Sequence, residues 1–204
     1  MKMLLRFCFM GLLSVVILAG CGGGGGGGGE SSAPAASTLG GTAAVGDPIV
    51  NSTVQVKCAG GSALSDTTDA AGVWQVTISG QTLPCAVELT GGTINGAANN
   101  TSYHSIATNW GTVNITPLTD LMVANLAAQD PGIWFAGLTG ATLTPITTTT
   151  ADISLTNVRT ALSGLAPLST IDPVTTTFTA TPGSTGDDML AALQTALTNT
   201  GVSY

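Results

Sequence analysis

The chain has 204 residues, of which 44% are hydrophobic and only 7% are charged, and its formal net charge is −7 at neutral pH. The four basic residues are dispersed, so no cluster of cations is available to neutralise nucleic-acid phosphates. The same scarcity argues against electrostatic docking on anionic lipid. Nucleic acid is therefore not an expected partner.

The first 20 residues have the pattern of an export signal. Lys2 and Arg6 precede an apolar run from Phe7 to Leu18. This run is about 12 residues long, whereas a membrane-spanning helix needs about 20. It ends in Leu18-Ala19-Gly20-Cys21. We therefore predict a cleavable signal peptide over residues 1–20.

Leu18-Ala19-Gly20-Cys21 resembles the lipobox of bacterial lipoproteins, in which a leucine and two small residues precede the modified cysteine. The resemblance implies a diacylglyceryl group on the Cys21 sulfur, cleavage before that residue, and acyl chains such as palmitate that anchor the protein in a cell membrane. Two or more acyl chains give stable anchoring. The alternative is an ordinary signal peptide with a chance cysteine. Gly22 follows in place of Asp, which favours the outer membrane, or a periplasm-facing site, in bacteria with two membranes.

Residues 21–38 are predicted to be a flexible tether. Gly22 to Gly29 is an unbroken glycine run, and small and polar residues follow it. Glycine loses the most conformational entropy on ordering and has no side chain to bury. Such a tether reaches roughly 20 to 25 Å and lifts a domain off the membrane without fixing its orientation.

Residues 39–116 read as short alternating strands separated by turns, the pattern of an antiparallel β-sandwich. Thr53 to Lys57 places its two valines on one face, and Val73 to Ile78 places Trp74, Val76 and Ile78 on one face. Trp74 is therefore expected in the core. Further strands are expected over Ala86–Leu89 and Thr112–Ile115.

This region also resembles the carboxypeptidase regulatory-like domains, small prealbumin-like (transthyretin-like) sandwiches. The likeness rests on four stretches: Gly41–Ala43, Asp47–Val54, Thr67–Trp74 and Val87–Gly92. The chain departs from that family in having Ala71 where a second acidic residue is common, and in its cysteine pair. The resemblance implies a spacer or adhesive module, and it transfers no catalytic residue.

Cys58 and Cys85 remain once Cys8 is lost with the signal peptide and Cys21 is lipidated. An even pair in an oxidising compartment predicts a disulfide. The alternative is a metal site, but the two cysteines and the distant His104 lack the spacing of metal-ligand pairs.

Residues 117–204 are predicted to be a helical segment with Thr-rich loops. Thr116-Pro117 fits an N-cap followed by a first helical proline, ahead of apolar residues at helical spacing. A second helix is expected from Asp152 as its cap to Leu165, and a third from a capping box at Thr185–Asp188 to a stop at Gly201. Thr147 to Thr150 and Thr175 to Thr181 are expected to be loops. Because three short helices make a thin core, this half should pack on the sandwich or on a partner.

The candidates for catalysis are few. His104, the only histidine, could serve a hydrolase as base, but the chain has no G-x-S-x-G motif and a polar strand face explains the residue equally well. Paired carboxylates could cleave glycosides, but Glu30 lies in the tether and Glu88 is the only other glutamate. Asp187-Asp188 is better explained as helix capping.

The candidates for binding are also weak. Asp66 to Asp69 could contribute to a calcium site, but the stretch lacks the ligand spacing of a calcium-binding loop, so a turn is the better interpretation. We expect no metal and no cofactor. Trp110 and Trp134 are the tryptophans that could stack on a ligand such as a sugar, although Ile133-Trp134-Phe135 could instead fill the joint between the two halves.

The sequence thus predicts an α+β protein with an antiparallel sandwich followed by a small helical segment. Its predicted function is that of a non-enzymatic cell-envelope lipoprotein, a tethered structural or interaction module whose partner is an unknown envelope protein or glycan. The alternative is a polysaccharide- or ligand-binding module at the cell surface, and an envelope hydrolase is the remote one.

Overall fold

A computed structural model describes residues 37–163 and 171–200. The predicted signal peptide, Cys21, nearly all of the predicted tether, Leu165 and Gly201 lie outside these residues. Within the described ranges, no helix combines the length and apolar character needed to cross a membrane.

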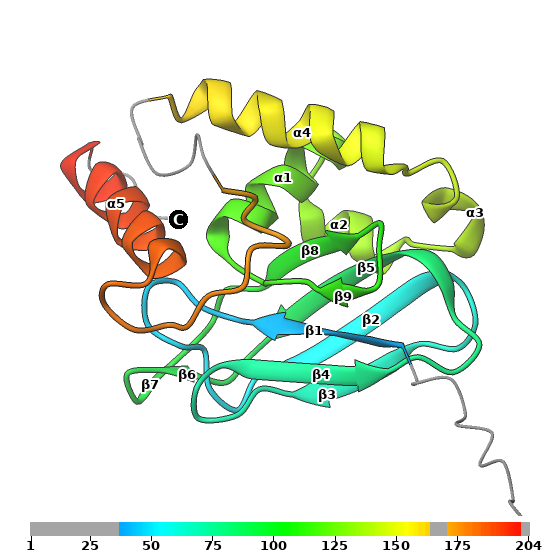
Figure 1. Ribbon diagram of the computed structural model, residues 1–204, viewed down its shortest axis with the longest axis horizontal. Coiled ribbons are helices and arrows are strands. Elements are labelled where there is room, and N and C mark those ends of the chain that lie inside the picture. Colours follow the sequence, from blue (N-terminus) through cyan, green and yellow to red (C-terminus); the bar gives the residue numbers. More distant parts are fainter. Residues whose placement is uncertain (1–36, 164–170, 201–204) are drawn as a thin grey trace, which may run out of the picture. The chain divides into compact units, whose positions relative to one another are not determined.

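The described strands form two main sheets and a small hairpin (Figure 1). The larger sheet is antiparallel throughout, in the order β3 (Leu64–Thr67), β2 (Thr53–Gly60), β5 (Thr82–Thr90) and β8 (Tyr103–Ala107). In the smaller sheet, β1 (Thr38–Thr42) lies between β4 (Val73–Thr77), to which it is antiparallel, and β9 (Gly111–Thr112), to which it is parallel. The hairpin pairs β6 (Thr93–Ile94) with β7 (Ala97–Ala98). The predicted combination of antiparallel-rich, sandwich-like sheets with helices is confirmed.

The main core lies between the two sheets. Val54 and Val56 of β2 are fully buried, as their shared face predicted. Trp74 of β4 is 1% exposed and belongs to the same apolar cluster, which confirms it as a core residue. Leu39 of β1 is also buried there. Alternation of apolar residues therefore identified the faces that the two sheets turn toward each other.

The outer face of the larger sheet is covered by helices (Figure 1). The helices with buried residues on this face are α1 (Pro117–Ala127), α2 (Pro131–Ala136) and α3 (Gly140–Leu143). Two further helices, α4 (Thr148–Ala161) and α5 (Thr185–Thr200), contribute their buried apolar residues to the main core. A second apolar cluster joins Ala86 and Ile106 of the sheet to Val123 of α1, Phe135 of α2 and Leu143 of α3. The helical half therefore packs on the sandwich, which was one of the two expectations, the other being that it packs on a partner.

The starts of α1 and α5 agree with the sequence, that of α4 corrects it, and α2 and α3 were not predicted. Thr116 caps α1 and Pro117 is its first residue, as predicted. Asp152 is not the cap of α4, because that helix begins four residues earlier, where Thr147 accepts from the Thr150 main-chain N–H and the Thr150 hydroxyl accepts in return. The stretch from Thr147 to Thr150 is therefore a capping box and a first helical turn rather than a loop.

Helix α5 begins at Thr185, as predicted, but its capping residue differs by one from the prediction. The Ser184 hydroxyl accepts from the Asp187 N–H at 3.3 Å, and the Ser184 carbonyl accepts from the Asp188 N–H at 2.9 Å. The Asp188 carboxylate accepts from the Gly183 N–H at 3.1 Å. Ser184 therefore takes the capping position that was assigned to Thr185.

Candidate functional site

His104 lies at the centre of a buried group of polar side chains on the outer face of the larger sheet. It belongs to β8, directly opposite Glu88 of β5, and both face the first turn of α1, which carries Asp120. His104 is 2% exposed. The expected polar strand face is therefore covered by a helix rather than by solvent. We call Glu88, His104 and Asp120 the acid–histidine cluster.

Both ring nitrogens of His104 contact a carboxylate. Nδ1 lies 2.6 Å from Asp120 Oδ1 and Nε2 lies 3.2 Å from Glu88 Oε1. The His104 main-chain N–H also donates to Asp120 Oδ1, at 2.8 Å. Because an ionised carboxylate can only accept, both ring contacts are hydrogen bonds when each ring nitrogen carries a hydrogen.

The chemistry open to this cluster is stabilising rather than nucleophilic. In the described part of the chain, neither ring nitrogen contacts a hydroxyl or a thiol, and the side chain of His104 is only 3% exposed. The Thr119 hydroxyl donates to the His104 carbonyl at 2.8 Å, which adds a further bond between α1 and β8. The cluster thus holds the first turn of α1 against the sheet.

Phe135 of α2 lies between His104 and a lysine on the same sheet face. Its ring centroid is 6.0 Å from that of His104 and 4.3 Å from the Lys57 ammonium, which also donates to the Phe135 carbonyl at 2.9 Å. Cation–π and charge-assisted hydrogen bonds of this kind fix the position of α2.

On the other face of β8, burial raises the pKa of Tyr103, and a hydrogen bond to Thr101 opposes that rise.

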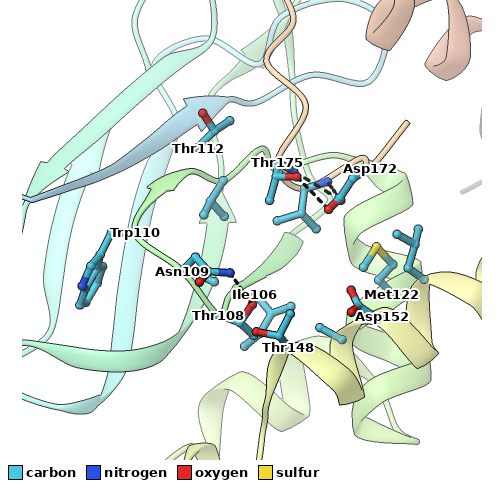
Figure 2. A pocket seen from close by; sticks show the side chains of 15 residues that line it. Ile106, Thr108, Asn109, Trp110, Thr112, Met122, Thr148, Asp152, Asp172 and Thr175 are labelled. Carbon is cyan, nitrogen blue, oxygen red and sulfur yellow. Dashed lines mark hydrogen bonds between the residues drawn. The ribbon is translucent and has the colours of Figure 1, made fainter. Parts of the chain in front are cut away.

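A separate cavity of about 210 Å³ lies where α4, the turn after β8 and the segment 172–175 meet (Figure 2). Its lining combines two kinds of surface. The apolar part is made of buried side chains: Ile106, Val113, Met122, Leu155 and Val174. The polar part consists of hydroxyl, amide and carboxylate groups: Thr108, Asn109, Thr112, Thr148, Asp152, Asp172 and Thr175.

The two carboxylates of the cavity differ in their bonding. Asp172 folds back on its own turn, accepting from the Val174 N–H at 2.8 Å and from the Thr175 hydroxyl at 2.8 Å (Figure 2). Asp152 is exposed on α4; its main-chain carbonyl accepts from the Thr156 hydroxyl, and its carboxylate has no hydrogen-bond or ion-pair partner among the described residues. Asp152 is therefore the carboxylate that a ligand in this cavity could engage.

The structure does not bring the two candidate tryptophans together. Trp110 is partly buried and borders the cavity, with its ring on the side away from Asp152 (Figure 2). Trp134 packs against the second apolar cluster, and Phe135 beside it is buried there, whereas Ile133 is 69% exposed. Trp134 and Phe135 therefore fill the joint between the sandwich and the helical segment, which was the alternative to a ligand-stacking role for Trp134.

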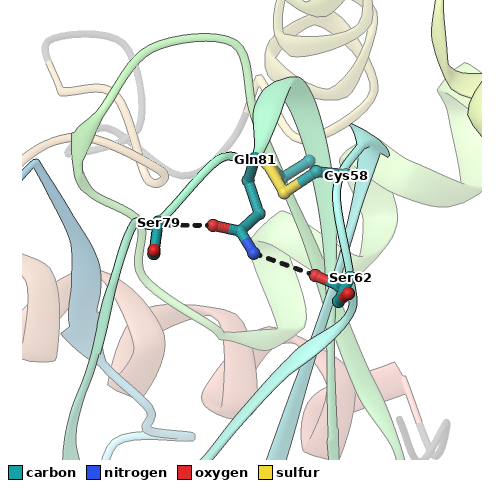
Figure 3. Close-up of a disulfide and its surroundings, with 5 residues drawn as sticks. Cys58, Ser62, Ser79 and Gln81 are labelled. Atoms are coloured by element: carbon teal, nitrogen blue, oxygen red, sulfur yellow. Dashed lines mark hydrogen bonds between the residues drawn. A yellow bond between two sulfur atoms is a disulfide. The ribbon is translucent and has the colours of Figure 1, made fainter.

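Cys58 and Cys85 form the predicted disulfide, which joins directly opposed residues of β2 and β5. Beside it, the buried Gln81 side chain accepts from the Ser79 N–H at 2.7 Å and donates to the Ser62 carbonyl at 3.1 Å (Figure 3). This end of the larger sheet is thus held by one covalent bond and by an amide that bridges two loops.

Within the acidic stretch from Asp66 to Asp69, Asp69 serves a turn, whereas Asp66 lies in β3 and joins it to β4. Asp69 accepts from the N–H groups of Ala71 and Val73, both at 2.8 Å, and Asp66 accepts from the Gln75 N–H at 2.7 Å. Within the described ranges, no group of three or more His, Cys, Asp or Glu side chains is placed to hold a metal ion. The turn interpretation is therefore confirmed for Asp69 and wrong for Asp66, which is a strand residue.

Asp187, in the first turn of α5, is 6% exposed, and its Oδ1 has no hydrogen-bond partner in residues 37–163 and 171–200. Burial raises the pKa of its carboxyl above the ordinary value of 3.8, and the nearby Asp188 and Asp47 raise it further. Asp187 therefore lowers the stability of the fold when it is ionised, despite its place at a helix N-terminus.

The chain matches no protein-family model, no curated protein and no solved structure.

Replacing Asp120 with Ala should lower the free energy of unfolding by about 3 to 5 kcal/mol, because it leaves the buried His104 without its closest partner. Urea denaturation measures this loss. Asp152→Ala is the matched control and should change stability by no more than about 0.5 kcal/mol, since that carboxylate is exposed. Equal losses in the two variants would show that the cluster does not hold α1.

Asp187→Asn should raise stability at neutral pH, since it removes a carboxylate whose ionised form is disfavoured by folding. Because the folded-state pKa is raised, the parent chain regains this stability as the pH falls through that pKa, and the two chains should converge below 3.8. Thermal unfolding over a pH series measures the difference. Asp188→Ala, which loses the hydrogen bond from the Gly183 N–H, should instead be destabilising at neutral pH.

Removing the disulfide by Cys58→Ala with Cys85→Ala should cost roughly 3 to 4 kcal/mol, the chain-entropy value for the 27-residue separation. Denaturant unfolding of the variant and of the parent chain measures the cost. Chemical reduction of the parent should produce the same loss. A change below about 1 kcal/mol in both experiments would contradict this expectation.

Proposed function

We propose that this chain is a non-enzymatic lipoprotein of the bacterial cell envelope, in which a lipid-anchored tether carries a folded interaction module. The lipobox-like residues Leu18 to Cys21 and the glycine run after them support the anchor and the tether. The anchored chain would lie in the outer membrane, or face the periplasm, in bacteria that have two membranes.

The observation that carries this proposal is the bond between Cys58 and Cys85. Disulfides persist in oxidising compartments and are rare in the cytosol. Export of the chain would remove Cys8 and modify Cys21, and the remaining two cysteines are the ones that are bonded. The cysteine usage of the whole chain is thus consistent with an exported lipoprotein.

The non-enzymatic part of the proposal is supported by the state of His104. It is the only histidine of the chain, it is buried, and both its nitrogens contact carboxylates. A general base must be able to reach the proton that it abstracts. The hydrolase alternative would therefore need the acid–histidine cluster to open.

We further propose a prealbumin-like sandwich of the carboxypeptidase regulatory-like kind for residues 39–116. The two sheets with a shared core and the turn at Asp69–Gly72 support it. At this turn Gly72 has a φ of +75°, and a Cβ there would approach the Ala43 carbonyl oxygen to 2.4 Å, so a residue with a side chain is disfavoured on both counts. A spacer or adhesive role would follow from this family.

A second candidate function, the binding of a glycan or another envelope ligand, is favoured by the cavity beside Trp110. Pockets that join apolar surface to a few polar groups are the usual form of a small-molecule site. Binding and anchoring are compatible, because the tether leaves the orientation of the domain free.

Cys21→Ser should release the protein from the membrane fraction, because no acyl chain can then be attached to that position. Fractionation of cells, with labelled palmitate as a tracer, measures the release. Cys8→Ser is the matched control and should leave both labelling and membrane retention unchanged. Retention of Cys21→Ser in washed membranes would contradict the lipoprotein proposal.

A further inference from the structure

We propose that the cavity between α4 and the segment 172–175 binds a single sugar-sized ligand that bears hydroxyl groups and a protonated amine, as a hexosamine unit does. This inference deepens the second function proposed above and rests on it. The argument uses the size of the cavity, the two kinds of surface that line it, and the sign of its charges.

The size of the cavity suits one small ring. Its volume of about 210 Å³ corresponds to roughly seven water molecules at the volume that each occupies in the liquid. The described residues that line it come from four parts of the chain: residues 106–113, Met122, residues 148–155 and residues 172–175. The cavity is therefore a product of tertiary packing and not of one loop.

The lining is amphipathic, as is the surface of a sugar ring. Side chains such as Met122, Leu155 and Val174 are buried and can contact carbon-bound hydrogens. Hydroxyls from Thr108 and Thr148 can exchange hydrogen bonds with ligand hydroxyls, because each both donates and accepts. A purely apolar ligand would leave these polar groups without partners, which is costly.

The charge of the lining selects among such ligands. Among the described residues of the lining, Asp152 and Asp172 are the charged ones, and none is Lys, Arg or His. The bonds within the 172–175 turn engage both oxygens of Asp172, so Asp152 supplies the carboxylate with free acceptor sites. A ligand amine would satisfy Asp152, whereas a carboxylate or phosphate on the ligand would be repelled.

The expected difference in affinity between the amino sugar and the neutral sugar follows from the exposure of Asp152. An exposed pair of opposite charges contributes modestly, so the amine should improve affinity by about two- to fivefold over the neutral hexose. The acidic hexose should bind more weakly than the neutral one. The order expected is therefore glucosamine, then glucose, then glucuronic acid.

The experiment is a calorimetric titration of the purified full chain, in a detergent without a sugar headgroup, with these three sugars. Asp152→Asn should bring the affinities for glucosamine and glucose together while retaining glucose binding. Asp47→Asn, which removes an exposed charge remote from the cavity, is the matched control and should preserve the ratio. Ala151→Leu, which fills the cavity, should weaken binding of all the sugars.

A glucosamine dimer separates a free sugar from the end of a glycan chain: tighter binding of the dimer indicates the glycan, and equal binding indicates the single unit. The inference is overturned if none of the sugars binds, if Asp152→Asn leaves the ratio unchanged, or if Asp47→Asn lowers it equally. Should Ala151→Leu not fold, Asp152→Asn still decides. If Cys21→Ser is released from the membrane but the parent chain binds none of the sugars, the proposal of an anchored module is supported and only the sugar-binding inference is contradicted.

Discussion

The bonds between Asp120 and β8 are the constraint on which the helical half depends. One carboxylate oxygen accepts from the His104 main chain and contacts its ring, so α1 is tied to the sheet at one point. The far side of α1 then supports α4, where the Ser154 hydroxyl donates to the Met122 carbonyl at 2.6 Å. Because α4 forms one wall of the cavity, the position of that wall follows from the contact at His104.

Strand β5 connects this constraint to the rest of the sandwich. It carries Cys85, bonded to β2, and three residues later Glu88, which contacts His104 on β8. A chain with only 7% charged residues thus uses several of them where strands and helices join. Burying charged side chains is costly unless they are paired. The paired charged groups here therefore join the helices to the sheet and do not add to the apolar core.

Strands β2, β4 and β5 and the disulfide could be predicted from the sequence because they depend on local signals. Strands β1 and β8 were not individually predicted, and the strand expected over Thr112–Ile115 is observed only at Gly111–Thr112. Alternation at Val54 and Val56 marks a face, and two remaining cysteines in an exported chain indicate a bond. The acid–histidine cluster could not be predicted, because alternation says that Glu88 and Ala86 share a face and not what covers it. The early start of α4 was missed because Thr147 to Thr150 resembles a loop in composition, while its reciprocal side-chain bonds act as a helix cap. The cavity has no local signal, since its described walls come from four separate parts of the chain, Met122 of α1 among them.

The place of β1 in the smaller sheet has a mechanical consequence. It is the first strand after the proposed tether, and it pairs along both edges, with β4 and with β9. If the chain is held at Cys21, a pulling force transmitted through the tether enters the fold at Thr38 and loads both ladders of β1 at once. The covalent bond at Cys58 reinforces only the other sheet, so resistance to extension would be set by backbone hydrogen bonds sheared in parallel.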